Sequence, residues 1–254
     1  MILHETDFPY YTFGNLSNQT GLRHFVTSSG DGAATDVNLR TLGGAGNRQR
    51  LAQTIGFSIS KLTTGEQTHS LNITTVNSAN AGRGNLDINT RIANTDALIS
   101  NEPGICIMVL TADCVPILLY DPVARAVAAV HAGWRGTAGG IIGIVIERMK
   151  YEFDCTPENL LAAIGPCIGP CCFEVGEEVT SAFRNENGIV LRQSNWSRPH
   201  VDLTESNFRQ LTATGIRAEN IEMAHICTKC SNGQFFSHRR NQTLGRIGSG
   251  IVLV

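Results

Sequence analysis

The chain has little of what marks nucleic-acid-binding, membrane or secreted proteins. Its 254 residues carry 20 basic and 22 acidic side chains, a formal net charge of −2, so no basic surface for a polyanion is expected. No apolar run approaches the roughly 20 residues that span a bilayer. The first residues, MILHETDFPYYTFGN, lack the basic and apolar regions of a secretory signal. We therefore expect a cytoplasmic protein with no nucleic-acid or membrane partner.

Lysine is scarce, and the cysteines are too few for a disulfide scaffold. Only Lys61, Lys150 and Lys229 are lysines, which leaves 20 − 3 = 17 arginines. Arginine suits carboxylates and phosphates, although GC-rich codon usage produces the same bias. In a reducing compartment the eight cysteines should be buried thiols, metal ligands or catalytic groups.

Strand and helix patterns alternate along the chain after a glycine-rich segment at residues 28–46. Continuous apolar runs at 104–112 and 115–120 predict buried strands, and further strands are expected at 125–134, 160–165, 219–227, 234–238 and 250–254. Helical patterns cover 47–56, 137–153, 174–186 and 202–215. No linker divides the sequence. We expect a single α/β domain over residues 1–254, with mixed β-sheets flanked by helices.

The strongest site signal is a hairpin that carries a cysteine before its first strand and a histidine near the end of its second. Asp121 and Pro122 occupy the preferred first positions of a type I turn. If residues 121–124 form that turn, Cys114 and His131 pair directly and point to the same face. Such a pair would be a metal site or a nucleophile with its base.

The plain alternative is a buried thiol beside a buried imidazole, with no function. Asp113 next to the cysteine, and Trp134 and Arg135 just after the histidine, favour the floor of a pocket instead, because polar and cationic groups gather there.

Six ordered motifs over residues 60–254 resemble the YfiH/laccase-domain family, whose members are also called multicopper polyphenol oxidases and laccase-domain purine nucleoside phosphorylases. The motifs are GEQTHS, NTDALIS, TADCVPILLYD, VHAGWRGTAGGI, IGPCIGPCCFEVGEEV and FFSHRRNQTLGRIGSGIVL. In the first of them Ser70 replaces the family's glycine.

The resemblance implies that His69, Cys114 and His131 bind one Zn²⁺, with Cu²⁺ as another possible metal. Three ligands leave an open coordination position, which is typical of a catalytic site. Asp96 and Asp113 are candidates for orienting a ligand imidazole. The implied activity is phosphorolysis of adenosine, inosine and methylthioadenosine, with adenosine deamination beside it.

The substrates would then be a purine nucleoside and phosphate, bound by a monomer or homodimer. We assign catalytic roles to Cys114, His131, Asp113 and Arg135, and consider Arg48, Arg135 and Arg240 for phosphate. Three rivals stay open: a copper-dependent polyphenol oxidase, a metal-free cysteine hydrolase using Cys114 and His131, and a non-catalytic metal-binding protein. Seven histidines in total are few for a laccase with several coppers.

A second cysteine motif stands apart from these residues. Cys227 and Cys230 have the C-x₂-C spacing of half a zinc ribbon. No second C-x₂-C pair exists, and CIGPCC at 167–172 is better explained as a glycine and proline turn. The spacing leaves a structural zinc open without predicting it.

Overall fold

The computed structural model describes residues 1–29, 44–242 and 245–254, and residues 30–43 and 243–244 lie outside these ranges. Most of the glycine-rich segment predicted at 28–46 therefore falls outside the described residues.

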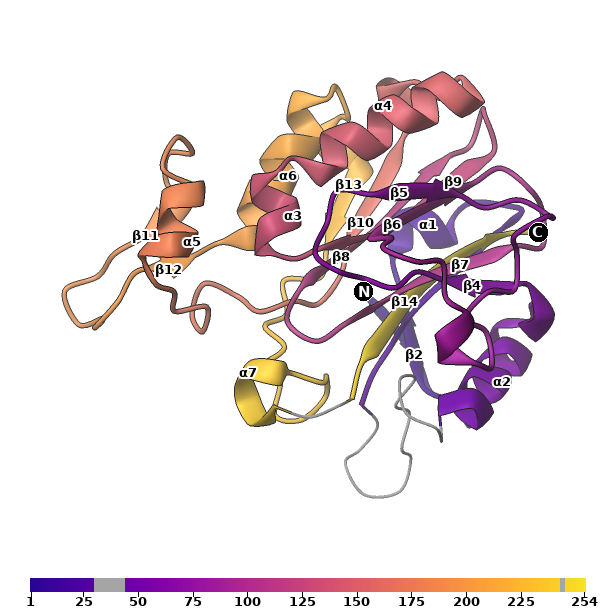
Figure 1. Ribbon diagram of the computed structural model, residues 1–254, viewed down its shortest axis with the longest axis horizontal. Helices are drawn as coiled ribbons and strands as arrows, with labels where there is room; N and C mark the ends of the chain where they lie inside the picture. Colours follow the sequence, from indigo (N-terminus) through magenta and orange to yellow (C-terminus); the bar gives the residue numbers. More distant parts are fainter. Residues whose placement is uncertain (30–43, 243–244) are drawn as a thin grey trace.

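Two six-stranded mixed sheets form the centre of the molecule (Figure 1). The first has the order β1-β2-β3-β14-β7-β4 and the second the order β13-β10-β8-β9-β6-β5. The strands of the first sheet are β1 (Ile2–His4), β2 (Tyr10–Thr12), β3 (Leu22–Thr27), β14 (Ile247–Leu253), β7 (Cys106–Thr111) and β4 (Leu62–Thr64). Those of the second are β13 (Ile221–Met223), β10 (Leu161–Ile164), β8 (Val115–Asp121), β9 (Ala126–Ala132), β6 (Ala97–Ser100) and β5 (Ile73–Thr75).

The sheets pack face to face, and helices cover their outer faces. Helix α2 (Gly44–Ile55) covers the first sheet, whereas α4 (Ile141–Phe153) and α6 (Leu203–Ala213) cover the second. Strand β7 shows why its sequence is apolar throughout: Ile107 and Val109 face the other sheet, while Met108 and Leu110 face the α2 side. Strands buried on both faces have continuous apolar runs. The α/β fold class expected from the sequence is confirmed.

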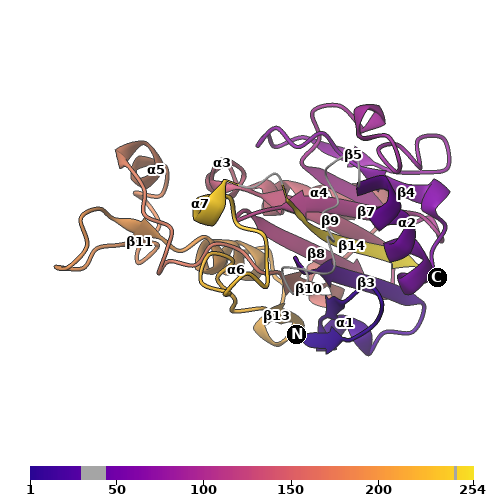
Figure 2. The ribbon, with the colours of Figure 1, turned by 90° about the horizontal axis from the view of Figure 1, so that it is seen from below.

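The remaining helices are short, and one group projects from the body. These helices are α1 (Gly14–Ser17), α3 (Trp134–Ala138), α5 (Glu177–Ala182) and α7 (His238–Asn241), with 3₁₀ turns at Ile59–Lys61, Ile88–Thr90, Pro157–Asn159 and Ala218–Asn220. Helix α5 and the small β11 (Val190–Leu191) and β12 (His200–Val201) pair extend away from the sheets in both views (Figure 2). Within the described ranges, no helix is long and apolar enough to cross a membrane.

Two predictions made from the sequence are wrong in detail. The β8–β9 hairpin pairs Asp121 with Ala126 and Pro116 with His131, so it is two residues out of the predicted register. The Asp121 carboxylate does accept from the backbone N–H groups of Val123 and Ala124, but Arg125, with φ of 49°, lengthens the loop. The second error is the strand expected at 234–238, where a loop leads into α7.

Candidate functional site

The site lies where the chain passes from the first sheet to the second. Strand β7 ends at Thr111 in the first sheet, and β8 begins at Val115 in the second. Asp113, between them, has φ of 88°, a conformation that is unusual for a residue with a side chain. The crossing leaves Cys114 at the open end of the sandwich, one residue before β8.

His131 lies on β9 with its side chain on the same side as that of Cys114. The register shift is two residues, and a shift of two preserves the face on which a side chain lies. Continued by one pair, the observed register places Gly133 opposite Cys114. A Cβ at Gly133 would lie 3.2 Å from Cys114 Sγ and 2.6 Å from His69 Cδ2. The glycine therefore leaves the space that the three side chains need.

His69 comes from a second crossing between the sheets, residues 65–72, which join β4 to β5. Its φ is 61°, so the backbone turns sharply at this residue. The backbone N–H of His69 donates to Asp96 Oδ1 at 3.1 Å, and that of Ser70 donates to Asp96 Oδ2 at 2.8 Å. The loop is thus wrapped around a single buried carboxylate.

The three side chains expected to bind a metal meet in space. Donor atoms of His69, Cys114 and His131 all lie within 4.8 Å of one another, and Cys114 Sγ is 3.7 Å from His69 Nε2. The two imidazole rings are 4.9 Å apart at an interplanar angle of 76°. One sulfur and two imidazole nitrogens form a donor set that zinc accepts while keeping a fourth position open. The residues present therefore fit the metal implied by the sequence.

Asp96 holds this arrangement together. Its Oδ1 lies 2.7 Å from His131 Nδ1, which leaves the other ring nitrogen available as a ligand. Its Oδ2 also accepts from the Ser70 hydroxyl at 2.7 Å. Burial would raise the pKa of Asp96, but hydrogen bonds from His131 and Ser70 lower it to about 2. Asp96 is thus a fixed negative charge beneath the site, as the sequence suggested. The part played by Ser70 was missed.

In the metal-free site, Cys114 and His131 form an ion pair. Burial opposes ionisation of Cys114, yet the charge and hydrogen bond of His131, then those of His69, lower its pKa to about 6. Burial would lower the pKa of His131, but the charge of Cys114 and the hydrogen bond to Asp96 raise it to about 9. The sulfur is therefore a thiolate near neutral pH, the form that binds metals and attacks electrophiles.

A cleft of about 590 Å³ opens over these side chains. Besides the three donors, its lining includes Trp134 and the arginines Arg91, Arg135, Arg239 and Arg246. The volume lies within the range of small-molecule sites, and the arginines favour an anionic substrate. Arg91 and Arg246 were not singled out from the sequence, because arginines scattered along the chain give no signal that they converge.

Asp113 has a supporting place in this cleft. Its Oδ1 accepts from the Thr228 hydroxyl at 2.6 Å, and its Oδ2 accepts from the Arg239 backbone N–H at 2.7 Å. Both carboxylate oxygens thus hold neighbouring loops. Within the described part of the chain Asp113 makes no hydrogen bond with either ligand imidazole, so the geometry favours a positioning role for it over the catalytic role expected.

The three arginines considered for phosphate have different surroundings. Arg135 lines the cleft, stacks over Trp134 at 4.1 Å and pairs with Glu178 at 2.9 Å. Arg48 is only 1% exposed and donates to the carbonyls of Gly84 and Asn85.

Arg240 is likewise engaged by backbone, because its guanidinium donates to the carbonyls of Thr228 and Phe235. Neither Arg48 nor Arg240 is among the described residues that line the cleft. The structure therefore corrects both of these assignments and leaves Arg135.

Comparison with known proteins identifies the family of this chain. The family model described as multi-copper polyphenol oxidoreductase laccase matches residues 40–254. A purine nucleoside phosphorylase from Bacteroides thetaiotaomicron is 37% identical, with 95% of each chain covered. Adenosine deaminase RL5, from an unknown prokaryotic organism, is 40% identical over 80% of this chain and 79% of its own. The crystal structure of YlmD from Geobacillus stearothermophilus superposes with a TM-score of 0.88 at 30% identity, covering 98% of this chain and 97% of that one. The chain belongs to the multi-copper polyphenol oxidoreductase laccase family.

Proposed function

We propose that this protein is a zinc-dependent purine nucleoside phosphorylase that also deaminates adenosine and cleaves methylthioadenosine. The observation that carries the proposal is the convergence of His69, Cys114 and His131 at the floor of an arginine-lined cleft. Relatives named for both activities support the choice of substrate. Eight free cysteines suit the reducing cytoplasm, where we place the enzyme.

The ligand trio would hold the zinc ion, with Asp96 keeping His131 in the orientation that a ligand needs. When bound, zinc supplies Lewis acidity toward an oxygen of the substrate or of water. Copper also binds thiolate and imidazole, but one trio with two histidines is small for an oxidase with several coppers. We therefore favour zinc.

The arginine side of the cleft would bind phosphate. Arg135 is 55% exposed and can turn from Glu178 toward an anion, since exposed ion pairs of this kind are weak. A guanidinium fork positions phosphate for attack on the sugar carbon, releasing the free purine and the sugar 1-phosphate. Orientation of this kind is a major part of catalysis in reactions between two bound substrates.

The deciding experiment is turnover of inosine and adenosine with and without phosphate, separated chromatographically. Purified protein should convert inosine to hypoxanthine and ribose 1-phosphate only when phosphate is present, and adenosine to inosine in either case. Cys114→Ala should abolish both reactions. Oxidation of polyphenols by copper-loaded protein, with no cleavage of inosine, would overturn the proposal.

A cysteine hydrolase remains the second candidate, because Cys114 and His131 form a thiolate–imidazolium pair in which the histidine has taken the proton of the nucleophile. A second imidazole 3.7 Å from the sulfur has no task in that mechanism. Full activity of metal-stripped protein, still blocked by thiol alkylation, would favour the hydrolase.

A further inference from the structure

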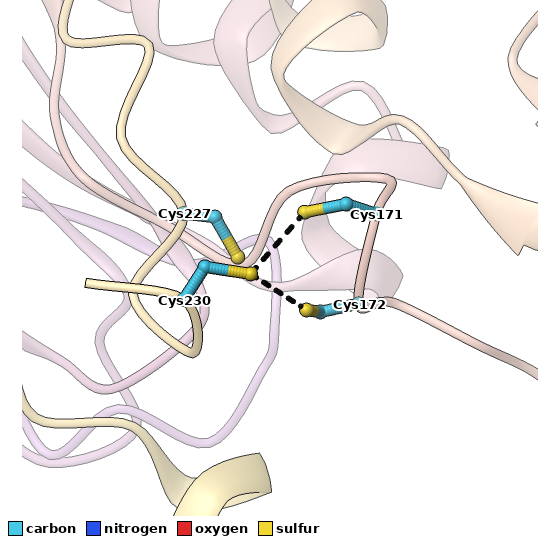
Figure 3. A group of neighbouring side chains, drawn as sticks. All are labelled: Cys171, Cys172, Cys227 and Cys230. Atoms are coloured by element: carbon cyan, nitrogen blue, oxygen red, sulfur yellow. Dashed lines mark hydrogen bonds between the residues drawn. The ribbon is translucent and has the colours of Figure 1, made fainter. Parts of the chain in front are cut away.

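Four cysteines form a second cluster outside the cleft. Cys171 and Cys172 lie in the loop after β10, and Cys227 and Cys230 lie in the segment after β13 (Figure 3). Their four sulfur atoms all lie within 4.8 Å of one another. Cys230 Sγ is 3.1 Å from Cys172 Sγ and 3.7 Å from Cys171 Sγ.

The sheet topology explains why these segments meet. Strands β10 and β13 are parallel neighbours, so the chain leaves both strands at the same end of the sheet. An isolated parallel bridge between Cys167 and Cys227 keeps the two segments side by side beyond the strands. The adjacent pair Cys171 and Cys172 thereby faces the C-x₂-C pair. The second cysteine pair was present in the sequence, but Cys171 and Cys172 are adjacent, so the C-x₂-C spacing did not identify them as partners of Cys227 and Cys230.

We propose that Cys171, Cys172, Cys227 and Cys230 bind a second, structural zinc ion. Four thiolates around one zinc at about 2.3 Å would place sulfur atoms about 3.8 Å apart, close to the spacing seen here. Core packing does not explain the cluster, because Cys171 and Cys230 are exposed. The observed sulfur separations also exceed the roughly 2.05 Å of a disulfide.

The backbone around the cluster leaves room for the four sulfur atoms. A Cβ at Gly169 would lie 3.4 Å from Cys171 Sγ and 3.2 Å from Cys227 Cβ, so a side chain there would crowd the cluster.

This zinc would brace one wall of the cleft. Thr228, inside the C-x₂-C segment, donates its hydroxyl to Asp113 beside Cys114. Arg239 lines the cleft and donates to the carbonyls of Cys172 and Glu174. With four protein ligands the ion has no open position, so its role is structural. The inference stands on these contacts alone and does not depend on the proposed function.

The test is zinc content per chain, measured by elemental analysis on wild type and matched variants. Wild-type protein should hold one more zinc ion per chain than Cys230→Ser, which is about two against about one when the site of His69, Cys114 and His131 is also filled. Cys114→Ala should keep the zinc ion of the four-cysteine cluster. The control Cys155→Ala, at a buried cysteine outside both clusters, should still hold two. Circular dichroism would verify that each variant is folded.

Cobalt substitution identifies the ligands in case Cys230→Ser fails to fold. Cobalt-loaded Cys114→Ala protein, with only the four-cysteine cluster left, should show the intense thiolate charge-transfer bands of a four-sulfur tetrahedral site.

Three results would overturn the inference: one zinc in wild type with Cys230→Ser unchanged, a disulfide within the cluster in freshly purified protein, or iron in place of zinc. Wild-type protein that holds two zinc ions but does not catalyse phosphorolysis would instead refute only the proposed function.

Discussion

Gly133 sets the space available to the ligands, and adding one methyl group there tests the site directly. In Gly133→Ala the new Cβ would lie 2.6 Å from His69 Cδ2 and 3.3 Å from His69 Nε2. Ordinary carbon contacts are about 3.5–4.0 Å, so the His69 ring must retreat by about 1 Å. Metal sites tolerate about 0.2 Å in ligand distance. The ring therefore cannot keep its place as a ligand.

The expected result is loss of metal affinity with little loss of fold stability. Gly133 has φ of −68° and ψ of 172°, which alanine adopts without strain. We expect zinc affinity, measured by chelator competition, to fall by about 100-fold or more, because even loss of a bond supporting a ligand costs about 10–100-fold. Phosphorolysis should fall by at least a similar factor, since 1 Å of misplacement alone can cost about 100-fold.

The matched control is Gly136→Ala, three residues further along in α3. Its Cβ would meet its nearest neighbour, Ile141 Cγ2, at 3.6 Å, an ordinary contact, and alanine favours the helix by up to about 1 kcal/mol. Zinc affinity and activity should be unchanged there. If Gly133→Ala binds zinc as tightly as wild type, the ligand set derived from this geometry is wrong.

Three further predictions address the groups around the ligands. Asp96→Asn keeps the shape but removes the charge, so zinc affinity should fall about 10–100-fold by chelator competition; unchanged affinity would show that the carboxylate does not support His131. Arg135→Ala should slow phosphorolysis about 100-fold, since losing a bond to a charged group costs a few kcal/mol. Arg135→Lys should restore little, and deamination should suffer less than phosphorolysis; equal losses would exclude a phosphate role. In metal-free protein, Cys114 should be alkylated by iodoacetamide with a midpoint near its pKa of about 6. The rate should rise with pH because the thiolate forms above that value, and His131→Ala should move the midpoint upward. A midpoint near that of an ordinary thiol in the unsubstituted protein would contradict the ion pair.

The central strands and helices follow from local pattern, which is why they could be predicted. The apolar runs of β7 and β8 identified buried strands, and the helical pattern over 202–215 identified α6, which begins after Asp202, whose carboxylate accepts from the Glu205 backbone N–H. The placement of β7 and β8 in two different sheets could not be predicted. It depends on a turn with positive φ at Asp113, and a residue other than glycine gives no reason to expect such a turn.

Cys114 and His131 were predicted to lie together for a reason that survived an error in register, whereas His69 was implied by the family resemblance alone. A shift of two residues moved the partner of Cys114 from His131 to Gly133 but left both side chains on one face. The burial of Arg48 and the meeting of the four cysteines could not be predicted, because they depend on packing and on pairing between distant segments. Neither property is visible in the spacing of residues along the chain.

The placement of two of the ligands on crossings between the sheets has a consequence for folding. His69 lies on the β4–β5 crossing, Cys114 on the β7–β8 crossing and His131 on β9. The donor set is therefore complete only after the two sheets have docked. A metal that binds this set shifts the equilibrium toward the docked state by mass action. It therefore stabilises the contact between the two sheets. Amide hydrogen exchange near the crossing between β7 and β8 should slow when the ion is added. Metal affinity would then report how completely the two sheets are docked.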